Sequence, residues 1–299
     1  MRALVRTNAG QSAGHLEGLP PEIRREVEIV WGDVRDGDAA RAACAGRESV
    51  LHLAALISIP FSYERPEETA SVNHMGTLGL LRAARDAGVG LFVQTSTSEV
   101  YGSAQTVPMT ESHPLQAQSP YAASKIAADQ TALAFHRTYG LPVAVLRPFN
   151  TYGPRQSARA VIPLVLSQIL HSDRVRMGSL TPRRDYTFVT DTARAFVSVL
   201  ESDRPPIGET LHFGSGASHT IGEVVAWAMK VSGRDLPIES DPSRIRPSAS
   251  EVERLECDAS AFRARTGWAP KVGMEEGLRA TWEWLRARPE VARHALGSL

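Results

Sequence analysis

Residues 92–99 read Phe92-Val93-Gln94-Thr95-Ser96-Thr97-Ser98-Glu99. The first four predict a buried strand, and the strand ends in hydroxyl groups followed by one carboxylate. In open parallel sheets, functional side chains gather at the carboxyl ends of the strands. The stretch therefore predicts an α/β fold with a functional site just beyond Thr95.

Residues 119–125 read Ser119-Pro120-Tyr121-Ala122-Ala123-Ser124-Lys125. Ser119 and Pro120 predict the start of a helix, on which a tyrosine and a lysine four residues apart share one face. An ammonium near a phenol favours the phenolate, which moves the phenol pKa from about 10 toward neutrality. Such a phenol can accept a proton from a sugar or alcohol hydroxyl while hydride leaves the same carbon. The pair alone is weak evidence, but together with the hydroxyl-rich strand end it indicates a catalytic site.

The composition argues against several classes of protein. The 299 residues include 33 basic and 33 acidic side chains, and no basic stripe points to a nucleic acid. No apolar run approaches the roughly 18 residues of a membrane span, so we expect no membrane partner and no signal peptide. Cys44 and Cys257 lie far apart and predict reduced thiols in the cytoplasm. Neither they nor the histidines show metal-ligand spacing, so no metal is expected.

The rest of the chain alternates short apolar runs with helical patterns. Residues 66–87 and 119–139 each predict a long helix, and in the first of them Val72, Met75 and Leu81 fall on the apolar face. Prolines between positions 154 and 247 mark an irregular C-terminal portion, which we expect to build a substrate lobe. Further strands are expected at 27–31, 49–53, 143–146 and 210–213.

Both stretches resemble the extended short-chain dehydrogenase/reductase family, which contains nucleotide-sugar epimerases, dehydratases and decarboxylases. The resemblance covers nearly the whole chain, with the motifs in the family's order. It implies a Rossmann-like doubly wound parallel sheet with a smaller C-terminal substrate-binding lobe. The dinucleotide-binding domain would span 1–155, with 189–215 returning to it, and the lobe would span 156–188 and 216–299. The other matching segments are Gly32–Asp36, His52–Ala55, Val72–Thr77, Arg147–Arg155, Arg184–Val189, Arg246-Pro247 and Ser250–Leu255.

The start of the chain differs from the family pattern. Family members open with a strand and a Gly-x-x-Gly-x-x-Gly turn that seats the cofactor pyrophosphate on a helix N-terminus. Residues 1–6 instead resemble the second strand, which implies that roughly thirty residues, one strand and one helix, are missing ahead of them. A misassigned start codon, a truncation or a natural variant with weakened dinucleotide binding would explain this. Because the first strand is central, we expect exposed edges on its two neighbours and poor NAD binding by the chain as given.

The resemblance implies NAD as the cofactor, since family members that return their hydride within one turnover use it. Arg6 stands where an acidic residue would receive the adenosine ribose, which keeps NADP as the less favoured alternative. Asp33 would face the adenine amino group, and the small Ala54 and Ala55 would let the cofactor approach the backbone. The residues expected at the cofactor are Asp33, Val34, Leu53, Ala54, Ala55, Thr95, Tyr121, Lys125 and Phe149.

The resemblance also implies a reaction. Tyr121 would remove the proton of the sugar 4-hydroxyl, Lys125 would tune the phenol, and Thr97 would bond the same hydroxyl. Glu99 would then remove the C5 proton, which the 4-ketone acidifies, and the 6-hydroxyl would leave as water. Many 4,6-dehydratases carry an aspartate where this chain has the weakly acidic Ser98, so Glu99 would act as base and acid in turn. The expected enzyme is an NAD-dependent nucleotide-sugar 4,6-dehydratase, a lyase, with catalytic residues Thr97, Ser98, Glu99, Tyr121 and Lys125.

Substrate binding is expected in the C-terminal half. Asn150, Arg184 and Arg246 match family positions that hold the nucleotide diphosphate, a role suited to guanidinium forks. Arg159 would contact a substrate carboxylate, a diphosphate or only solvent. The surrounding sequence is similar to bacterial dehydratases of UDP- or GDP-N-acetylglucosamine, which favours those substrates. No residue reads the base, so UDP, GDP and dTDP all stay open.

Other functions stay open as well. Thr-Ser-Glu also occurs in UDP-glucuronate decarboxylases, in which an arginine such as Arg159 would hold the carboxylate. A 4-epimerase would need no acid or base at Glu99. A catalytically silent sugar-nucleotide-binding protein is the alternative from a different class.

A homodimer is expected from the resemblance alone. The helices at 66–87 and 119–139 resemble the pair that forms a four-helix interface in the family. Ordinary packing against the core of one chain would explain the same apolar faces.

Overall fold

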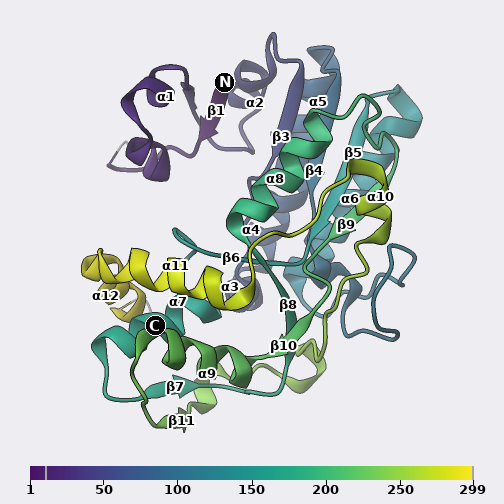
Figure 1. Ribbon diagram of the computed structural model, residues 1–299. Coiled ribbons are helices and arrows are strands. Elements are labelled where there is room, and N and C mark those ends of the chain that lie inside the picture. Colours follow the sequence, from purple (N-terminus) through teal and green to yellow (C-terminus); the bar gives the residue numbers. More distant parts are fainter. Residues whose placement is uncertain (11, 298–299) are drawn as a thin grey trace. The chain divides into compact units, whose positions relative to one another are not determined.

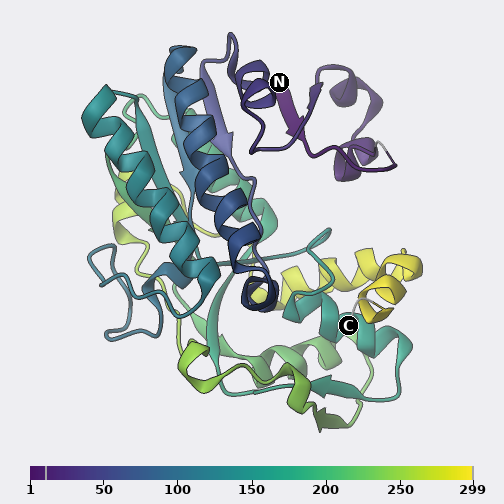
Figure 2. The same cartoon turned by 180° about the vertical axis from the view of Figure 1, so that it is seen from behind.

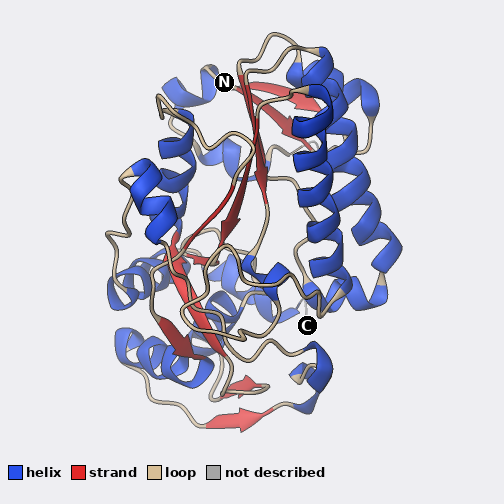
Figure 3. Ribbon diagram, turned by 90° about the vertical axis from the view of Figure 1, so that its right-hand side faces the viewer, coloured by secondary structure: helices blue, strands red, loops and turns tan. Residues whose placement is uncertain are grey.

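The computed structural model describes residues 1–10 and 12–297, and helices and strands alternate through it (Figure 3). Contacts along the chain divide it into two compact units, which are described separately below. The first unit comprises Met1–Val100, Ser119–Leu146 and Arg204–Leu211, and the second comprises Tyr101–Gln118, Arg147–Asp203 and the chain from His212 onward.

These limits differ from the expected domain limits. The sequence returns all of 189–215 to the first domain, whereas only Arg204–Leu211 belongs to the first unit. Residues 101–118, which separate the two functional stretches, belong to the second unit. The chain therefore passes between the units more often than its composition indicates. Which ligand each unit holds stays a prediction.

The main sheet of the first unit consists of β3 (Ser49–His52), β4 (Leu91–Thr95), β5 (Val143–Pro148) and β9 (Thr210–Phe213), in that order (Figure 1). β3 and β5 both run parallel to β4. β4 and β5 are buried along almost their whole length, as is usual for strands covered on both faces. The predicted α/β fold with a Rossmann-like parallel sheet is confirmed.

A second, smaller sheet of the first unit contains only β1 (Arg2–Val5) and β2 (Glu28–Trp31), which are parallel. Within the described residues, β1 pairs only with β2, and β3 pairs only with β4. Both strands therefore have an open edge, as the sequence predicts. β3 is accordingly only half-buried, whereas the neighbouring β4 is almost fully buried.

The helical run that starts at Pro66 contains a π-helical turn. It consists of α4 (Pro66–Ala70), the π turn η2 (Ser71–Met75) and α5 (Gly76–Asp86). A π turn inserts one residue into the helical register. Asn73 is consequently fully buried, while Met75 is 53% exposed. The long helix is confirmed, but the prediction that Met75 lies on the apolar face is wrong.

Helix α6 (Pro120–Tyr139) begins where the sequence predicts. The Ser119 side chain caps it by accepting a hydrogen bond of 3.1 Å from the backbone N–H of Ala122. Pro120 fills the first helical position, where no N–H is needed. The helix ends at Gly140, which has a φ of 71°. α5 and α6 pack against each other (Figure 2).

Short helices complete the first unit, and none of the helices in the described residues is long and apolar enough for a membrane span. Its core is formed by α2, α5 and α6 on the strands β4 and β5. The remaining helical elements are η1 (Gly14–Gly18), α1 (Pro21–Arg25), α2 (Gly37–Cys44), α3 (Ile59–Glu64) and the 3₁₀ turn η3 (Ser98–Tyr101).

The second unit has two small sheets. In the first, β8 (Arg183–Phe188) lies between β10 (Ser218–Thr220), to which it is antiparallel, and β6 (Asn150–Tyr152), to which it is parallel. The other pairs β7 (Val175–Met177) with β11 (Ile238–Ser240). Aromatic rings from β6 and β8 fill the core beside helices α7, α9 and α11. The helical elements are α7 (Val161–His171), α8 (Val189–Leu200), α9 (Ile221–Ser232), η4 (Pro242–Arg244), η5 (Ser248–Ser250), α10 (Ser260–Thr266), α11 (Met274–Arg286) and α12 (Pro289–Gly297).

Candidate active site

One face of helix α6 carries the predicted catalytic pair. Tyr121 and Lys125 are both buried, at 6% and 3% exposure, and Asp129 follows one turn later with no exposure. Successive turns of a helix place side chains four residues apart on the same face. We call Tyr121, Lys125 and Asp129 the helix-face cluster.

Lys125 is fixed by a backbone carbonyl at the end of β4. Its Nζ donates a hydrogen bond of 2.6 Å to the carbonyl oxygen of Thr95. Burial lowers the pKa of Lys125 to about 8, and the negative charge of Asp129 opposes that shift. The lysine is therefore poised to change charge close to physiological pH.

Tyr121 does not have the lowered pKa that the sequence predicts. Burial raises the pKa of its phenol, the hydrogen bond with the Thr97 side chain lowers it, and the charge of Glu99 raises it further. The desolvation of a fully enclosed phenol outweighs the expected help from Lys125, whose ammonium is bonded to the Thr95 carbonyl. The sequence assigns the Thr97 hydroxyl to the substrate, and in the structure it bonds Tyr121.

The short 3₁₀ turn η3 carries the remaining predicted catalytic residues. Thr97, just before it, and Glu99 are half-buried, whereas Ser98 is only 2% exposed. The backbone N–H of Glu99 donates to Thr97 Oγ1 at 3.2 Å, which fixes the turn between them. Thr97 and Glu99 are thus the accessible pair of the motif, and Ser98 is enclosed.

Several features of the first unit fit a bound dinucleotide. After β3, Leu53 is 59% exposed, and Ala54 and Ala55 leave the backbone accessible. The Thr95 hydroxyl at the end of β4 is buried and has no hydrogen-bond partner among the described residues. An open backbone next to an orphaned buried hydroxyl, at the carboxyl ends of adjacent parallel strands, is the environment in which α/β sheets hold nucleotides.

The residues after β2 are less accessible than those after β3, because they bond and pack with one another. The Asp33 carboxylate accepts hydrogen bonds from the Arg35 guanidinium at 2.7 and 2.8 Å and from the Arg35 backbone at 2.9 Å. These contacts with Arg35 lower the pKa of Asp33 to about 2. Val34 is buried against Gly76. Asp33 is therefore negatively charged, and its carboxylate is already paired with the Arg35 guanidinium.

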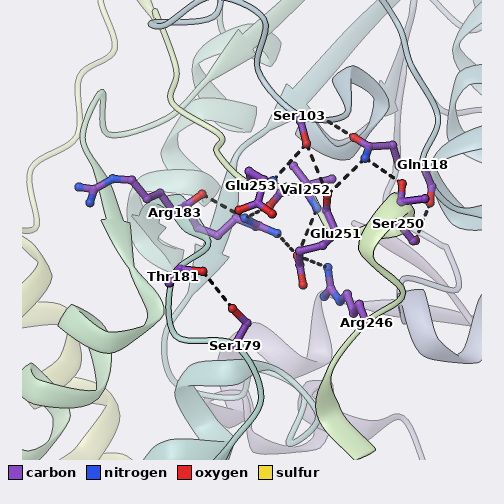
Figure 4. Close-up of polar contacts among 12 residues, drawn as sticks. Ser103, Gln118, Ser179, Thr181, Arg183, Arg246, Ser250, Glu251, Val252 and Glu253 are labelled. Carbon is purple, nitrogen blue, oxygen red and sulfur yellow. Dashed lines mark hydrogen bonds and ion pairs between the residues drawn. The ribbon is translucent and has the colours of Figure 1, made fainter. Parts of the chain in front are cut away.

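A second group of polar residues, entirely within the second unit, surrounds Glu251 (Figure 4). Its Oε1 accepts hydrogen bonds from Arg184 at 3.1 Å, from Arg246 at 3.4 Å and from the backbone of Val252 at 3.2 Å. Arg184 also donates to the Val252 carbonyl at 2.6 Å. We call Arg184, Arg246 and Glu251 the arginine cluster. It unites the two arginines that the sequence assigns to diphosphate binding.

The turn that carries Glu251 is clamped by Gln118, the last residue before the cap of α6 (Figure 4). The Gln118 amide accepts from the backbone of Ser103 at 2.5 Å and donates to the carbonyls of Ala249 and Glu251 at 3.1 and 3.3 Å. Ser250 returns a hydrogen bond of 2.6 Å to the Gln118 carbonyl. This clamp fixes the backbone on which the arginine cluster stands.

The other predicted residues of the second unit lie in different surroundings. Asn150 begins β6, and its side-chain oxygen is buried without a hydrogen-bond partner in the described chain. Phe149 is 2% exposed and packs its ring edge-on against His212. Arg159 is exposed on the loop before α7. Their contacts with cofactor or substrate stay predictions.

Sequence reasoning missed two residues of these clusters. Asp129 lies four residues after Lys125 and eight after Tyr121, so the helical spacing alone could have revealed it. Glu251 lies within the matching segment Ser250–Leu255 and has no predicted role of its own. No local signal reveals it, because its partner Arg184 lies 67 residues away in the chain.

Known proteins share both the sequence and the fold. A family model described as GDP-mannose 4,6 dehydratase matches residues 1–281. A dTDP-glucose 4,6-dehydratase of Streptomyces niveus is 35% identical over 264 residues, which cover 88% of this chain and 77% of that protein. The dTDP-glucose 4,6-dehydratase DesIV of Streptomyces venezuelae, solved with NAD bound, is 30% identical with a TM-score of 0.82, covering 97% of this chain and 98% of that one. A UDP-glucose 4-epimerase of Thermotoga maritima, solved with UDP-glucose, is 29% identical with a TM-score of 0.84, covering 95% and 90%. The chain therefore belongs to the NAD-dependent epimerase/dehydratase family of extended short-chain dehydrogenases/reductases.

Proposed function

We propose that this protein is an NAD-dependent nucleotide-sugar 4,6-dehydratase. The observation that supports this most directly is the half-buried Glu99, two residues beyond the hydroxyl that bonds Tyr121, on a backbone turn that Thr97 fixes. A 4-epimerase needs only Tyr121, Lys125 and Thr97, whereas a dehydratase also needs a base for the C5 proton. The relatives named as dTDP-glucose 4,6-dehydratases support the same activity.

The reaction begins at the sugar 4-hydroxyl. Tyr121 accepts the hydroxyl proton, and Thr97 holds the oxygen in place. NAD would be held beside Leu53, Ala54, Ala55 and Thr95, and bound there it would supply a hydride acceptor for C4 and a hydride donor for C6. Tyr121 must be a phenolate before it can accept that proton, and the charged Lys125 stabilises this phenolate, which offsets the cost of an anion in a buried position.

Glu99 carries the elimination. The 4-ketone acidifies the C5 proton, and the Glu99 carboxylate removes it. The resulting carboxylic acid then protonates the departing 6-hydroxyl, so that the C6–O bond breaks and one water leaves. Ser98 is enclosed and is a weak acid, so we assign both proton transfers to Glu99. Reduction at C6 also requires a proton at C5, which balances the proton that Tyr121 took from the 4-hydroxyl, and the product is a 4-keto-6-deoxy sugar nucleotide.

We assign the nucleotide diphosphate to the arginine cluster. Arginine binds phosphate oxygens in bidentate fashion, and Arg246 retains 28% side-chain exposure for such a contact. Asn150 and Arg159 are further candidates for the substrate. The sequence favours UDP- or GDP-N-acetylglucosamine as the substrate, and the named relatives add dTDP-glucose.

The experiment is an incubation of the protein with NAD and each of the three sugar nucleotides, with products followed by mass. We expect the loss of one water from one of them, and loss of this activity in Glu99→Gln with C4 oxidation retained. A conversion to the 4-epimer without mass change would assign an epimerase instead. Loss of carbon dioxide from UDP-glucuronate would assign a decarboxylase, and binding without any reaction would leave a silent binding protein.

Two further properties belong to the proposal. The packed pair α5 and α6 is the candidate surface for a homodimer built as a four-helix bundle, which sedimentation would test. Cys44 and Cys257 are both free and buried, which fits a reducing cytoplasm.

A further inference from the structure

The carboxylate of Asp129 is buried without an assigned purpose in the reaction. It lies on the helix-face cluster, one turn beyond Lys125 and two turns beyond Tyr121, and has no exposure. Its Oδ2 accepts a hydrogen bond of 2.6 Å from the hydroxyl of Ser96, the residue that follows β4. A carboxylate loses much of its hydration when it is buried, and proteins rarely enclose one without a charged partner.

Lys125 is the charged partner that the geometry offers. Its ammonium is also buried, and it donates a hydrogen bond to the neutral carbonyl of Thr95, which does not balance its charge. Burial works against this ammonium, and Asp129 is the charge that works in its favour. Two opposite charges one helical turn apart in a buried place stabilise each other's charged forms.

The other titratable groups nearby do not replace Asp129. His52 is buried beside Thr77, and burial together with the charge of Lys125 lowers its pKa to about 3, so it is neutral. Glu99 acts on Tyr121, whose pKa it raises, and the proposed reaction already uses its carboxylate. Asp129 also raises the pKa of Tyr121, as the weakest of the causes, so its main action falls on the lysine.

We propose that Asp129 is a positioning residue for the catalytic pair: its buried carboxylate keeps Lys125 protonated where Tyr121 requires a positive charge. This inference rests on the proposed function for its catalytic meaning. The charge relation between Asp129 and Lys125 can be measured without any reaction. The role of Asp129 therefore succeeds or fails separately from the choice of substrate.

The chain is well suited to a direct measurement of the lysine. Its lysines are Lys125, Lys230 and Lys271, and the latter two are exposed. Protein labelled with ¹³C at the lysine ε-carbon, without cofactor or substrate, is titrated by NMR, and Lys125→Met identifies the signal. In Asp129→Asn we expect the Lys125 titration to move down by about one pH unit or more.

Ser96→Ala is the matched control, because it removes the hydrogen bond to Asp129 but keeps the charge. In Ser96→Ala we expect no change in the Lys125 pKa, and no change in the pH at which kcat/KM falls on the alkaline side. Asp129→Asn should move that fall to lower pH. The proposal would be overturned if the Lys125 pKa were unchanged in Asp129→Asn or shifted equally in Ser96→Ala. Asp129 would then only hold Ser96 and the end of β4 in place through its hydrogen bond.

The proposal stays testable if Asp129→Asn fails to fold. The wild-type protein alone then decides, because a Lys125 that is already neutral at pH 7 cannot be held charged by Asp129. A missing turnover with every sugar nucleotide would sink the proposed function but would leave the lysine titration, and the conclusion from it, intact.

Discussion

The helix-face cluster and the arginine cluster hold their charges in opposite ways. In the helix-face cluster, Lys125 and Asp129 are buried on a regular helix. The single ammonium of Lys125 lies with one carboxylate, Asp129, and one phenol, Tyr121. In the arginine cluster, two guanidinium groups converge on one oxygen of Glu251, on a turn that lies partly open to solvent. Under the proposed function, the first cluster carries out the chemistry and the second binds the substrate, although a carboxylate already occupies its centre.

The difference indicates how each cluster meets its ligand. Tyr121 and Lys125 keep their places whether or not substrate is present, because helix packing fixes them. Arg184 and Arg246 must share their donors between Glu251 and an incoming anion. We therefore expect changes in the helix-face cluster to act on the rate of reaction. Changes in the arginine cluster should act on stability and binding.

The largest effect is expected from Tyr121→Phe. The variant keeps the ring and its packing but removes the group that accepts the proton, so kcat should fall by about 1,000-fold or more. The free energy of unfolding and the affinity for a nucleoside diphosphate should hardly change. Steady-state kinetics and urea denaturation test this, and a variant within tenfold of wild-type activity would remove Tyr121 from the reaction.

Glu251→Gln should destabilise the protein and strengthen anion binding. It removes the negative charge that pairs with the buried Arg184 guanidinium, which should cost on the order of 2–3 kcal/mol of unfolding free energy. The same change frees positive charge, so UDP should bind more tightly and restore part of the stability.

Glu253→Gln provides the matched control for this variant. Glu253 lies two residues away, and its side chain is exposed, so its removal should change stability by less than about 0.5 kcal/mol. Denaturation curves with and without UDP compare the two variants. Equal effects at both positions would show that Glu251 does not govern the arginine cluster.

A moderate effect of pH should separate activity from stability. Since the pKa of Lys125 is lowered to about 8, raising the pH through 8 removes the ammonium, and activity should fall. An unfolded lysine titrates near pH 10.4, so the unfolded chain binds more protons between about pH 8 and 10, and this lysine's contribution to stability rises there. Lys125→Met should lack that rise in urea denaturation, and a wild-type slope equal to the variant's would contradict the assignment.

The smallest effect concerns local motion. Backbone amides of residues 246–251, which include the short turn η5, should exchange hydrogen faster than those in the middle of α6, which are buried in a long helix. Addition of UDP should slow exchange in the turn and leave α6 unchanged. Equal slowing of both segments in exchange mass spectrometry would show that the two clusters respond to UDP with the same change in local motion.

Much of this architecture could be predicted locally. The cap at Ser119, the buried strand β4 and the placement of Tyr121 and Lys125 on one helix follow from neighbouring residues, and the structure reproduces all three. The open edges of β1 and β3 also agree with the sequence, because parallel strands without a partner remain exposed. These features depend on spacing and composition alone.

Other features depend on distant contacts that no local pattern encodes. The raised pKa of Tyr121 results from its enclosure by the folded chain, and enclosure cannot be inferred from the spacing to Lys125. Glu251 meets Arg184 only after the chain has folded. The exposure of Met75 follows from a π turn, whereas the periodicity of the sequence indicates a regular helix.

That π turn makes the segment Ser71–Met75 sensitive to the deletion of a single residue. The Asn73 side chain donates to the Leu56 carbonyl and to Ser124 Oγ at 2.9 Å each, and accepts from the Leu56 amide at 2.7 Å, so it ties the loop after β3 to the catalytic helix. The wider turn rotates Asn73 into that place by accommodating one additional residue. A single-codon deletion between Ser71 and Met75 would restore regular helical geometry and turn the amide away from both partners. This short stretch should therefore tolerate substitutions at Met75 far better than the loss of any one residue.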